Sequence, residues 1–72
     1  MMAELSLPQI AGLRLRKLIQ ENYQSQQEFA DDYGLELRAV SRYINQGITK
    51  VPTIQELAFF FGIDASDFFR LD

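Results

Sequence analysis

Three helix-start motifs divide this 72-residue chain and, more than any other feature, restrict it to a bundle of short helices. The motifs are SLPQ at 6–9, SQQE at 25–28 and TIQE at 53–56. Each is a capping box, in which a Ser or Thr hydroxyl and a Gln or Glu three residues later bond to free N–H groups of the helix start. In a chain this short, the helices must share one modest core.

Glycines and apolar spacing indicate where the helices end. Gly34 ends the second helix, because glycine takes a positive φ at no steric cost, and Gly47 and Gly62 end the next two. Period-two alternation is absent, so no strand is expected. The predicted helices cover 7–22, 26–33, 36–45, a stretch from TIQE to the residue before Gly62, and a last turn or two capped by Asp64. The predicted fold is all-α: a compact bundle of five short helices in a single domain, residues 1–72.

The composition argues against an enzyme, a metalloprotein and a membrane protein. The chain has no cysteine and no histidine, which removes disulfides, thiolate metal sites and the commonest general base. Asp31 and Asp32 are adjacent, so on a helix they point about 100° apart and form no catalytic carboxylate pair. No apolar run reaches the roughly 18 residues of a membrane span, and residues 1–9 do not resemble a signal peptide. We therefore expect a cytoplasmic protein without cofactor or metal.

The segment from Gln26 to Asn45 has the spacing of a helix-turn-helix motif. Its fifth position is Ala30, where a small side chain lets two helices cross closely. Its ninth position is Gly34, which permits a tight turn. Its fifteenth is Val40, a branched apolar residue that fills the space between the helices. In DNA-binding motifs of this kind, the second helix lies in the major groove.

Two stretches of the chain resemble the Cro/repressor-type family of DNA-binding domains, also called lambda-repressor-like or XRE domains. The first is LRLRKLIQENYQSQQEFADDYGLELRAVSRYINQG and the second is PTIQELAFFFGIDASDFF, and together they cover nearly the whole chain. The resemblance implies five helices, of which the third enters the major groove, usually in a homodimer on a pseudo-palindromic operator. It also implies a transcriptional regulator, expected to be a repressor that acts by occupying its operator.

The resemblance assigns residues to double-stranded DNA. Arg38 and Arg42 lie four residues apart on the predicted recognition helix, and arginine suits a guanine edge or a phosphate. Leu37 can contact a thymine methyl group or turn toward the core. Glu36 can accept from a cytosine amino group or simply favour the positive helix start. The predicted DNA-binding residues are Gln26, Gln27, Glu36, Leu37, Arg38, Ser41, Arg42, Asn45, Thr49 and Lys50.

The net charge of −3 is compatible with DNA binding only if the charges are segregated. The acidic residues fall largely late in the second predicted helix and in the C-terminal half. One positive face is therefore predicted despite the negative total, with binding that weakens steeply as salt rises. The basic residues assigned to this face are Arg14, Arg16, Lys17, Arg38, Arg42 and Lys50.

The consecutive phenylalanines of LAFFFG predict an exposed apolar patch. Three successive side chains fan around a helix, so one small core cannot bury all three rings. Such patches mark interfaces. The predicted homodimer interface comprises Phe59, Phe60, Phe68, Phe69 and Leu71. The alternative function is a protein-interaction module of the same fold, antitoxin-like or regulatory, that binds a protein partner through its acidic and Phe-rich surfaces.

Overall fold

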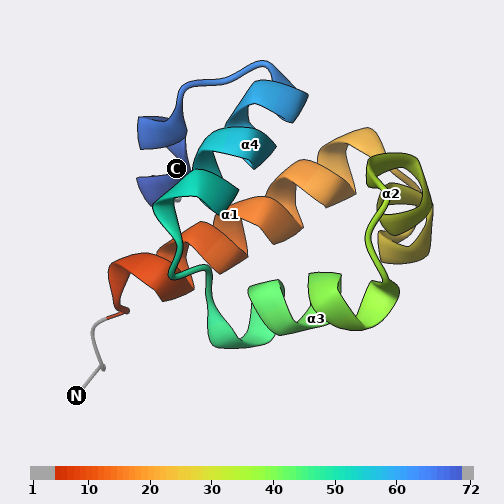
Figure 1. The fold of residues 1–72 in the computed structure, drawn as a ribbon, viewed down its shortest axis with the longest axis horizontal. Coiled ribbons are helices and arrows are strands. Elements are labelled where there is room, and N and C mark those ends of the chain that lie inside the picture. Colours follow the sequence, from red (N-terminus) through yellow and green to blue (C-terminus); the bar gives the residue numbers. More distant parts are fainter. Residues whose placement is uncertain (1–4, 71–72) are drawn as a thin grey trace.

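Four α-helices build the domain, with one short 3-10 segment after them (Figure 1). The computed structural model describes residues 5–70, and Leu71 of the predicted interface lies outside them. No strand occurs among residues 5–70, which confirms the all-helical class, but the fifth predicted helix is a 3-10 segment and not an α-helix. The elements are α1 (Leu7–Asn22), α2 (Gln26–Tyr33), α3 (Leu37–Gln46), α4 (Val51–Phe61) and η1 (Ala65–Phe69).

The first two capping boxes start α1 and α2 where the sequence predicts. At α1 the Gln9 N–H donates to Ser6 Oγ at 3.3 Å, and the Ser6 N–H donates to Gln9 Oε1 at 2.9 Å. At α2 the Glu28 N–H donates to Ser25 Oγ at 3.1 Å, but the Glu28 carboxylate accepts from the Gln24 N–H instead of returning to Ser25. The box is therefore complete only at α1, but at both helices a Ser hydroxyl satisfies a backbone donor that has no partner within the helix.

The third predicted capping box is wrong. Helix α4 begins at Val51 with Lys50 as its N-cap, so Thr53 lies inside the first turn and caps nothing. The reason is Pro52, whose fixed φ and missing N–H suit the first turn, so the helix starts three residues earlier than TIQE suggests. At η1, Asp64 occupies the N-cap position but its side chain makes no capping hydrogen bond.

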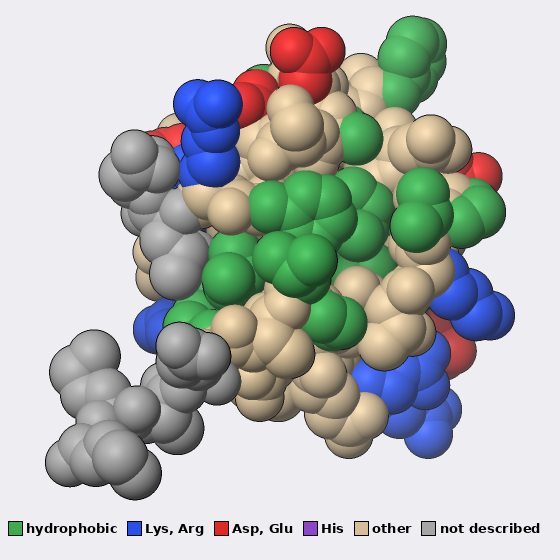
Figure 2. Space-filling view, turned by 90° about the vertical axis from the view of Figure 1, so that its left-hand side faces the viewer, with side chains coloured by type: hydrophobic (Ala, Val, Ile, Leu, Met, Phe, Trp, Pro, Cys, Tyr) green, Lys and Arg blue, Asp and Glu red, His purple; other side chains and the backbone are tan. Residues whose placement is uncertain are grey.

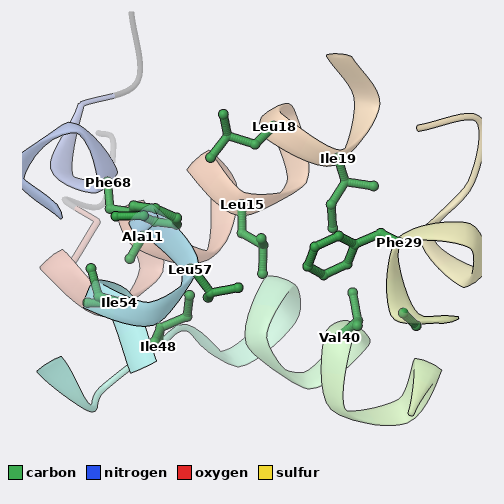
Figure 3. Close-up of a cluster of buried hydrophobic side chains, with 12 residues drawn as sticks. Ala11, Leu15, Leu18, Ile19, Phe29, Val40, Ile48, Ile54, Leu57 and Phe68 are labelled. Atoms are coloured by element: carbon green, nitrogen blue, oxygen red, sulfur yellow. The ribbon is translucent and has the colours of Figure 1, made fainter. Parts of the chain in front are cut away.

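Twelve apolar side chains form the core, and every helical element contributes at least one (Figure 3). The Phe29 ring lies between Ile19 of α1 and Val40 of α3, so it joins three helices. Phe68 is also fully buried, which removes it from the predicted dimer interface. The core residues are Ala11, Leu15, Leu18, Ile19, Phe29, Ala30, Val40, Ile48, Ile54, Leu57, Ala58 and Phe68.

Helices α1 and α3 touch through their backbones at two glycines, a contact that sequence reasoning missed. A Cβ on Gly12 would overlap the carbonyl oxygen of Tyr43 in α3. A Cβ on Gly47 would lie 2.7 Å from the carbonyl carbon and oxygen of Pro8 in α1. The same carbonyl accepts a hydrogen bond from the Ile48 N–H at 3.0 Å. The end of α3 is therefore tied directly to the start of α1.

A tyrosine–carboxylate hydrogen bond connects the end of α1 to α2. The Tyr23 hydroxyl donates to Asp32 Oδ2 at 2.6 Å. This hydrogen bond, together with desolvation and the charges of Asp32 and Glu28, raises the pKa of Tyr23 from 10.0 to about 12. Because the pKa is higher in the folded state, the stabilisation is complete below pH 10 and is lost as the pH rises toward 12.

We expect Asp32→Asn to lower the pKa of Tyr23 toward 10.0, since it replaces the carboxylate that accepts the Tyr23 hydrogen bond and removes the charge that opposes tyrosinate formation. Ultraviolet absorbance of tyrosinate during an alkaline titration measures this shift. Tyr23→Phe identifies the late-titrating component, because it removes that component while leaving Tyr33 and Tyr43 in place. An unchanged titration curve in Asp32→Asn would contradict the assigned cause.

Candidate nucleic-acid interface

A three-residue turn connects α2 to α3 and determines the direction in which α3 leaves. Gly34 ends α2 in the left-handed region, with φ 91°. The N–H groups of Gly34 and Leu35 both donate to the Ala30 carbonyl oxygen, each at 2.9 Å. Ala30 and Val40 are fully buried where the two helices pack, as their spacing predicts. The turn and these two contacts position α3 with only one side against the core.

The opposite side of α3 carries polar and basic side chains. At about 100° per residue, Arg38, Arg42 and Asn45 fall within an arc of roughly 60°, directed away from the buried Val40. All three are exposed. Leu37 is 38% exposed, so it lies at the surface and not in the core. An outward face of this composition can donate several hydrogen bonds to an acceptor-rich partner.

The charges near α3 are almost all positive. From residue 37 to residue 55 the chain has three basic residues and no acidic one. Glu36 lies just before this stretch, 3.9 Å from the Arg38 guanidinium, but both side chains are more than three-quarters exposed. Water screens such a pair, so it holds Arg38 only weakly. Locally, α3 and the loop after it are positive although the whole chain is negative.

Two cationic side chains line one hollow beside the end of α3. A hollow of about 380 Å³ lies between the end of α3 and the start of α4, and Arg42 and Lys50 are both in its wall. Neither residue has an ion-pair partner within the described part of the chain. The walls are formed by Arg42, Tyr43, Gln46, Gly47, Ile48, Thr49, Lys50 and Thr53.

The hollow joins three of the predicted DNA-binding residues, Arg42, Thr49 and Lys50, and adds two polar ones that sequence reasoning missed. The additional residues are Gln46 and Thr53. Helical spacing places Gln46 four residues after Arg42, which could have indicated it. Nothing in the sequence indicates Thr53, because its position depends on the path of the loop between the helices.

The predicted contacts on α2 differ from one another. On α2, Gln26 is partly buried at the first position of the helix. The predicted contact Ser41, which lies on α3, is likewise partly buried. The Gln27 amide donates to Asp31 at 2.9 Å, so it is engaged within its own helix. The Asp32 carboxylate of the same helix accepts from the Tyr23 hydroxyl. Asp31 and Asp32 are therefore both hydrogen-bonded to nearby side chains of this chain.

Arg16 lies on a different side of α1 from Arg14 and Lys17, so the three basic residues of this helix do not form one patch. Arg14 and Arg16 are two positions apart, about 200° around the helix, so they point to different sides. Arg16 is exposed, whereas Arg14 is partly buried and its Nε has no hydrogen-bond partner among residues 5–70. Figure 2 shows basic side chains at the lower right, with acidic ones beside them, a further basic side chain next to acidic ones at the upper left, and an apolar area in the middle. The stretch free of acidic residues is therefore 37–55, which contains α3 and the loop after it.

Among residues 5–70, no group of three His, Cys, Asp or Glu side chains could hold a metal ion. None of the described helices combines the length and apolar character that a membrane crossing requires. Comparison with protein-family models, with curated proteins and with solved structures finds no match to this chain.

Proposed function

We propose that this protein binds double-stranded DNA, with α2 and α3 acting as a helix-turn-helix and α3 entering the major groove. The observation that carries the proposal is the outward face of α3, where Arg38, Arg42 and Asn45 converge without a carboxylate between residues 37 and 55. A helix fits the major groove, which is about 12 Å wide. Arginine pairs with guanine through two donors, and asparagine pairs with adenine in the same manner.

Contacts to the DNA backbone complete the proposed interface. The hollow beside α3 contains two cations and the hydroxyl groups of Thr49 and Thr53, all of them donors that suit a phosphate oxygen. Such contacts fix the register of a protein on the duplex without reading its sequence. Arg38 and Asn45 do not line the hollow, so they are the residues proposed to contact bases. Arg42 lies between the outward face of α3 and the hollow. The protein would regulate transcription by occupying its operator sterically.

We expect Arg38→Ala/Arg42→Ala to abolish or strongly weaken DNA binding. Each arginine contact contributes about 1–3 kcal/mol, so the double variant should lose at least about tenfold in affinity. The dependence of log K on log salt should also become shallower by about one, because Arg42 beside the hollow is the one of the two that contacts a phosphate. Selection from random duplex DNA, followed by binding measurements at two salt concentrations, tests both expectations.

The matched control is Arg16→Ala/Arg70→Ala. It also removes two positive charges, but from exposed positions outside α3. We expect it to retain most of the affinity, because nonspecific attraction depends on net charge but groove contacts do not. Equal losses in the two variants would show that α3 is not the contact surface. Absence of salt-sensitive binding by the wild type would eliminate DNA as the ligand.

A second function, a protein-interaction module, is favoured by one observation, namely that Phe59 is 88% exposed. Exposed rings of this size mark interfaces more often than scattered aliphatic residues do. This alternative requires no DNA affinity, so the same selection experiment separates the two functions.

A further inference from the structure

The hollow beside α3 is larger than a contact with one DNA phosphate requires. Its volume of about 380 Å³ falls within the roughly 300–1,000 Å³ of pockets that bind small molecules. A phosphate of a duplex would reach only the opening of the hollow, because it is joined on both sides to the convex DNA backbone. The interior therefore has room for a free ligand that carries an organic group as well as a phosphate.

The charges of the hollow match an anion with two negative charges. Arg42 and Lys50 contribute two positive charges, and no carboxylate lines the wall. A phosphomonoester carries close to two negative charges at pH 7, since its second pKa is about 6, whereas each phosphodiester of DNA carries only one. Two cations in one hollow therefore suit a monoester better than a diester.

The other groups of the hollow suit the rest of such a ligand. The Arg42 guanidinium lies over the Tyr43 ring, 6.0 Å from its centroid, and this cation–π contact restricts where the guanidinium can move. Thr49 and Thr53 contribute hydroxyl groups, which can donate or accept hydrogen bonds. No side chain caps the start of α4 within residues 5–70, so the first N–H groups of this helix add positive potential there. The wall thus combines two cations with neutral polar groups and an aromatic ring.

We propose that the hollow binds a small organic phosphomonoester, such as a nucleoside monophosphate, with its phosphate between Arg42 and Lys50 and its organic group against Tyr43. This ligand occupies the same cations that the proposed function assigns to the DNA backbone. The ligand and DNA therefore exclude each other, and the hollow is an effector site whose occupation releases the operator. Only this competition rests on the proposed DNA binding, because the ligand site itself requires no DNA.

An NMR titration of the full chain without DNA tests the site directly. Adenosine monophosphate at low salt should shift the amide resonances of residues 42–53 in a saturable manner, with a Kd of about 1 mM or tighter. A dinucleoside monophosphate, whose phosphate is a diester, should bind about threefold more weakly or worse, because it has one charge fewer. Adenosine without phosphate should cause no saturable shift, and inorganic phosphate should bind more weakly than adenosine monophosphate.

Substitution of each cation tests the assignment of the phosphate. Arg42→Gln and Lys50→Gln should each raise the Kd for adenosine monophosphate by at least about threefold, since each removes one of the two charges. Both side chains are exposed, so the variants should fold, which circular dichroism verifies. Arg16→Gln is the matched control, because Arg16 is also an exposed arginine on a helix but does not line the hollow, and its Kd should stay close to that of the wild type.

The affinity should also follow the second ionisation of the ligand. From about pH 5.5 to about pH 7.0 the dianionic fraction of a phosphomonoester rises about fourfold, so its Kd should fall by about two- to fourfold. The titratable groups that line the hollow are Arg42, Tyr43 and Lys50, and the chain has no histidine. The ligand is therefore the group that titrates in this range, and binding of the diester should not change with pH.

Three results of these titrations would overturn the ligand site. They are a wild type without saturable shifts up to about 10 mM adenosine monophosphate, equal affinity for monoester and diester, and equal effects of Lys50→Gln and Arg16→Gln. A chain that binds both the monoester and DNA should release its DNA as the monoester is added, and simultaneous binding of the two would overturn the effector role. Because the titrations contain no DNA, their failure is distinguishable from failure of the proposed DNA binding.

Discussion

Gly47→Ala, which adds a single methyl group, should strongly destabilise this domain. Gly47 combines φ 99° with ψ 169°, a region of backbone conformation that is essentially restricted to glycine and costs about 1–3 kcal/mol for other residues. The new Cβ would also lie 2.7 Å from the Pro8 carbonyl group, which cannot yield without moving the start of α1. We expect a total loss of roughly 3 kcal/mol or more in the free energy of unfolding, measured by urea denaturation.

Gly34→Ala separates the two causes. Gly34 also has a positive φ of 91°, but a Cβ there would meet no atom within 4 Å. Only the left-handed conformation is then penalised, so we expect a loss of about 1–2 kcal/mol. If both variants lose the same stability, the contact between Gly47 and Pro8 has no energetic weight.

Phe68→Ala should remove a large part of the free energy of unfolding of this domain. Phe68 is fully buried although it lies on a five-residue 3-10 segment, where it packs into the core beside α1 and α4. Truncating a buried phenylalanine costs about 3–5 kcal/mol, and small domains have only about 5–15 kcal/mol in total. We expect a variant that is partly unfolded near room temperature, as measured by thermal and urea denaturation.

Phe69→Ala is the adjacent control. This ring is 38% exposed, so its removal should cost much less, about 1 kcal/mol. The comparison also tests whether Phe68 belongs to the core or to an interface, because an interface role would leave the stability of the monomer unaffected. Equal losses in the two variants would contradict the burial of Phe68.

Local chemistry explains which parts of the fold could be predicted from sequence. The bounds of α1 and α2 were predicted correctly, because the Ser6 and Ser25 caps act within one turn. The predicted start of α4 was wrong because Pro52 favours an earlier first turn than the capping motif. The close approach at Gly12 could not be predicted, since it depends on a helix more than 30 residues away.

The candidate site shows the same division. Arg38 and Arg42 are exposed because helical spacing places them opposite the buried Val40. Their exposure could therefore be predicted from the sequence. The hollow that joins Arg42 to Lys50 depends on the loop between α3 and α4, whose path has no sequence signature. The engagement of Gln27 by Asp31 was missed as well, although four-residue spacing on a helix allows it.

The glycine contacts between α1 and α3 have a consequence for how the chain selects one arrangement of its helices. The core contains no buried polar residue within 5–70, so no internal hydrogen bond between side chains distinguishes one helix pairing from another. Apolar cores of roughly correct volume tolerate sliding and repacking. Gly12 and Gly47 prevent this, because the two backbones can approach so closely only where both side chains are absent. The absence of side chains at these two glycines therefore fixes the register of α3 against α1. This register in turn sets the direction of Arg38 and Arg42.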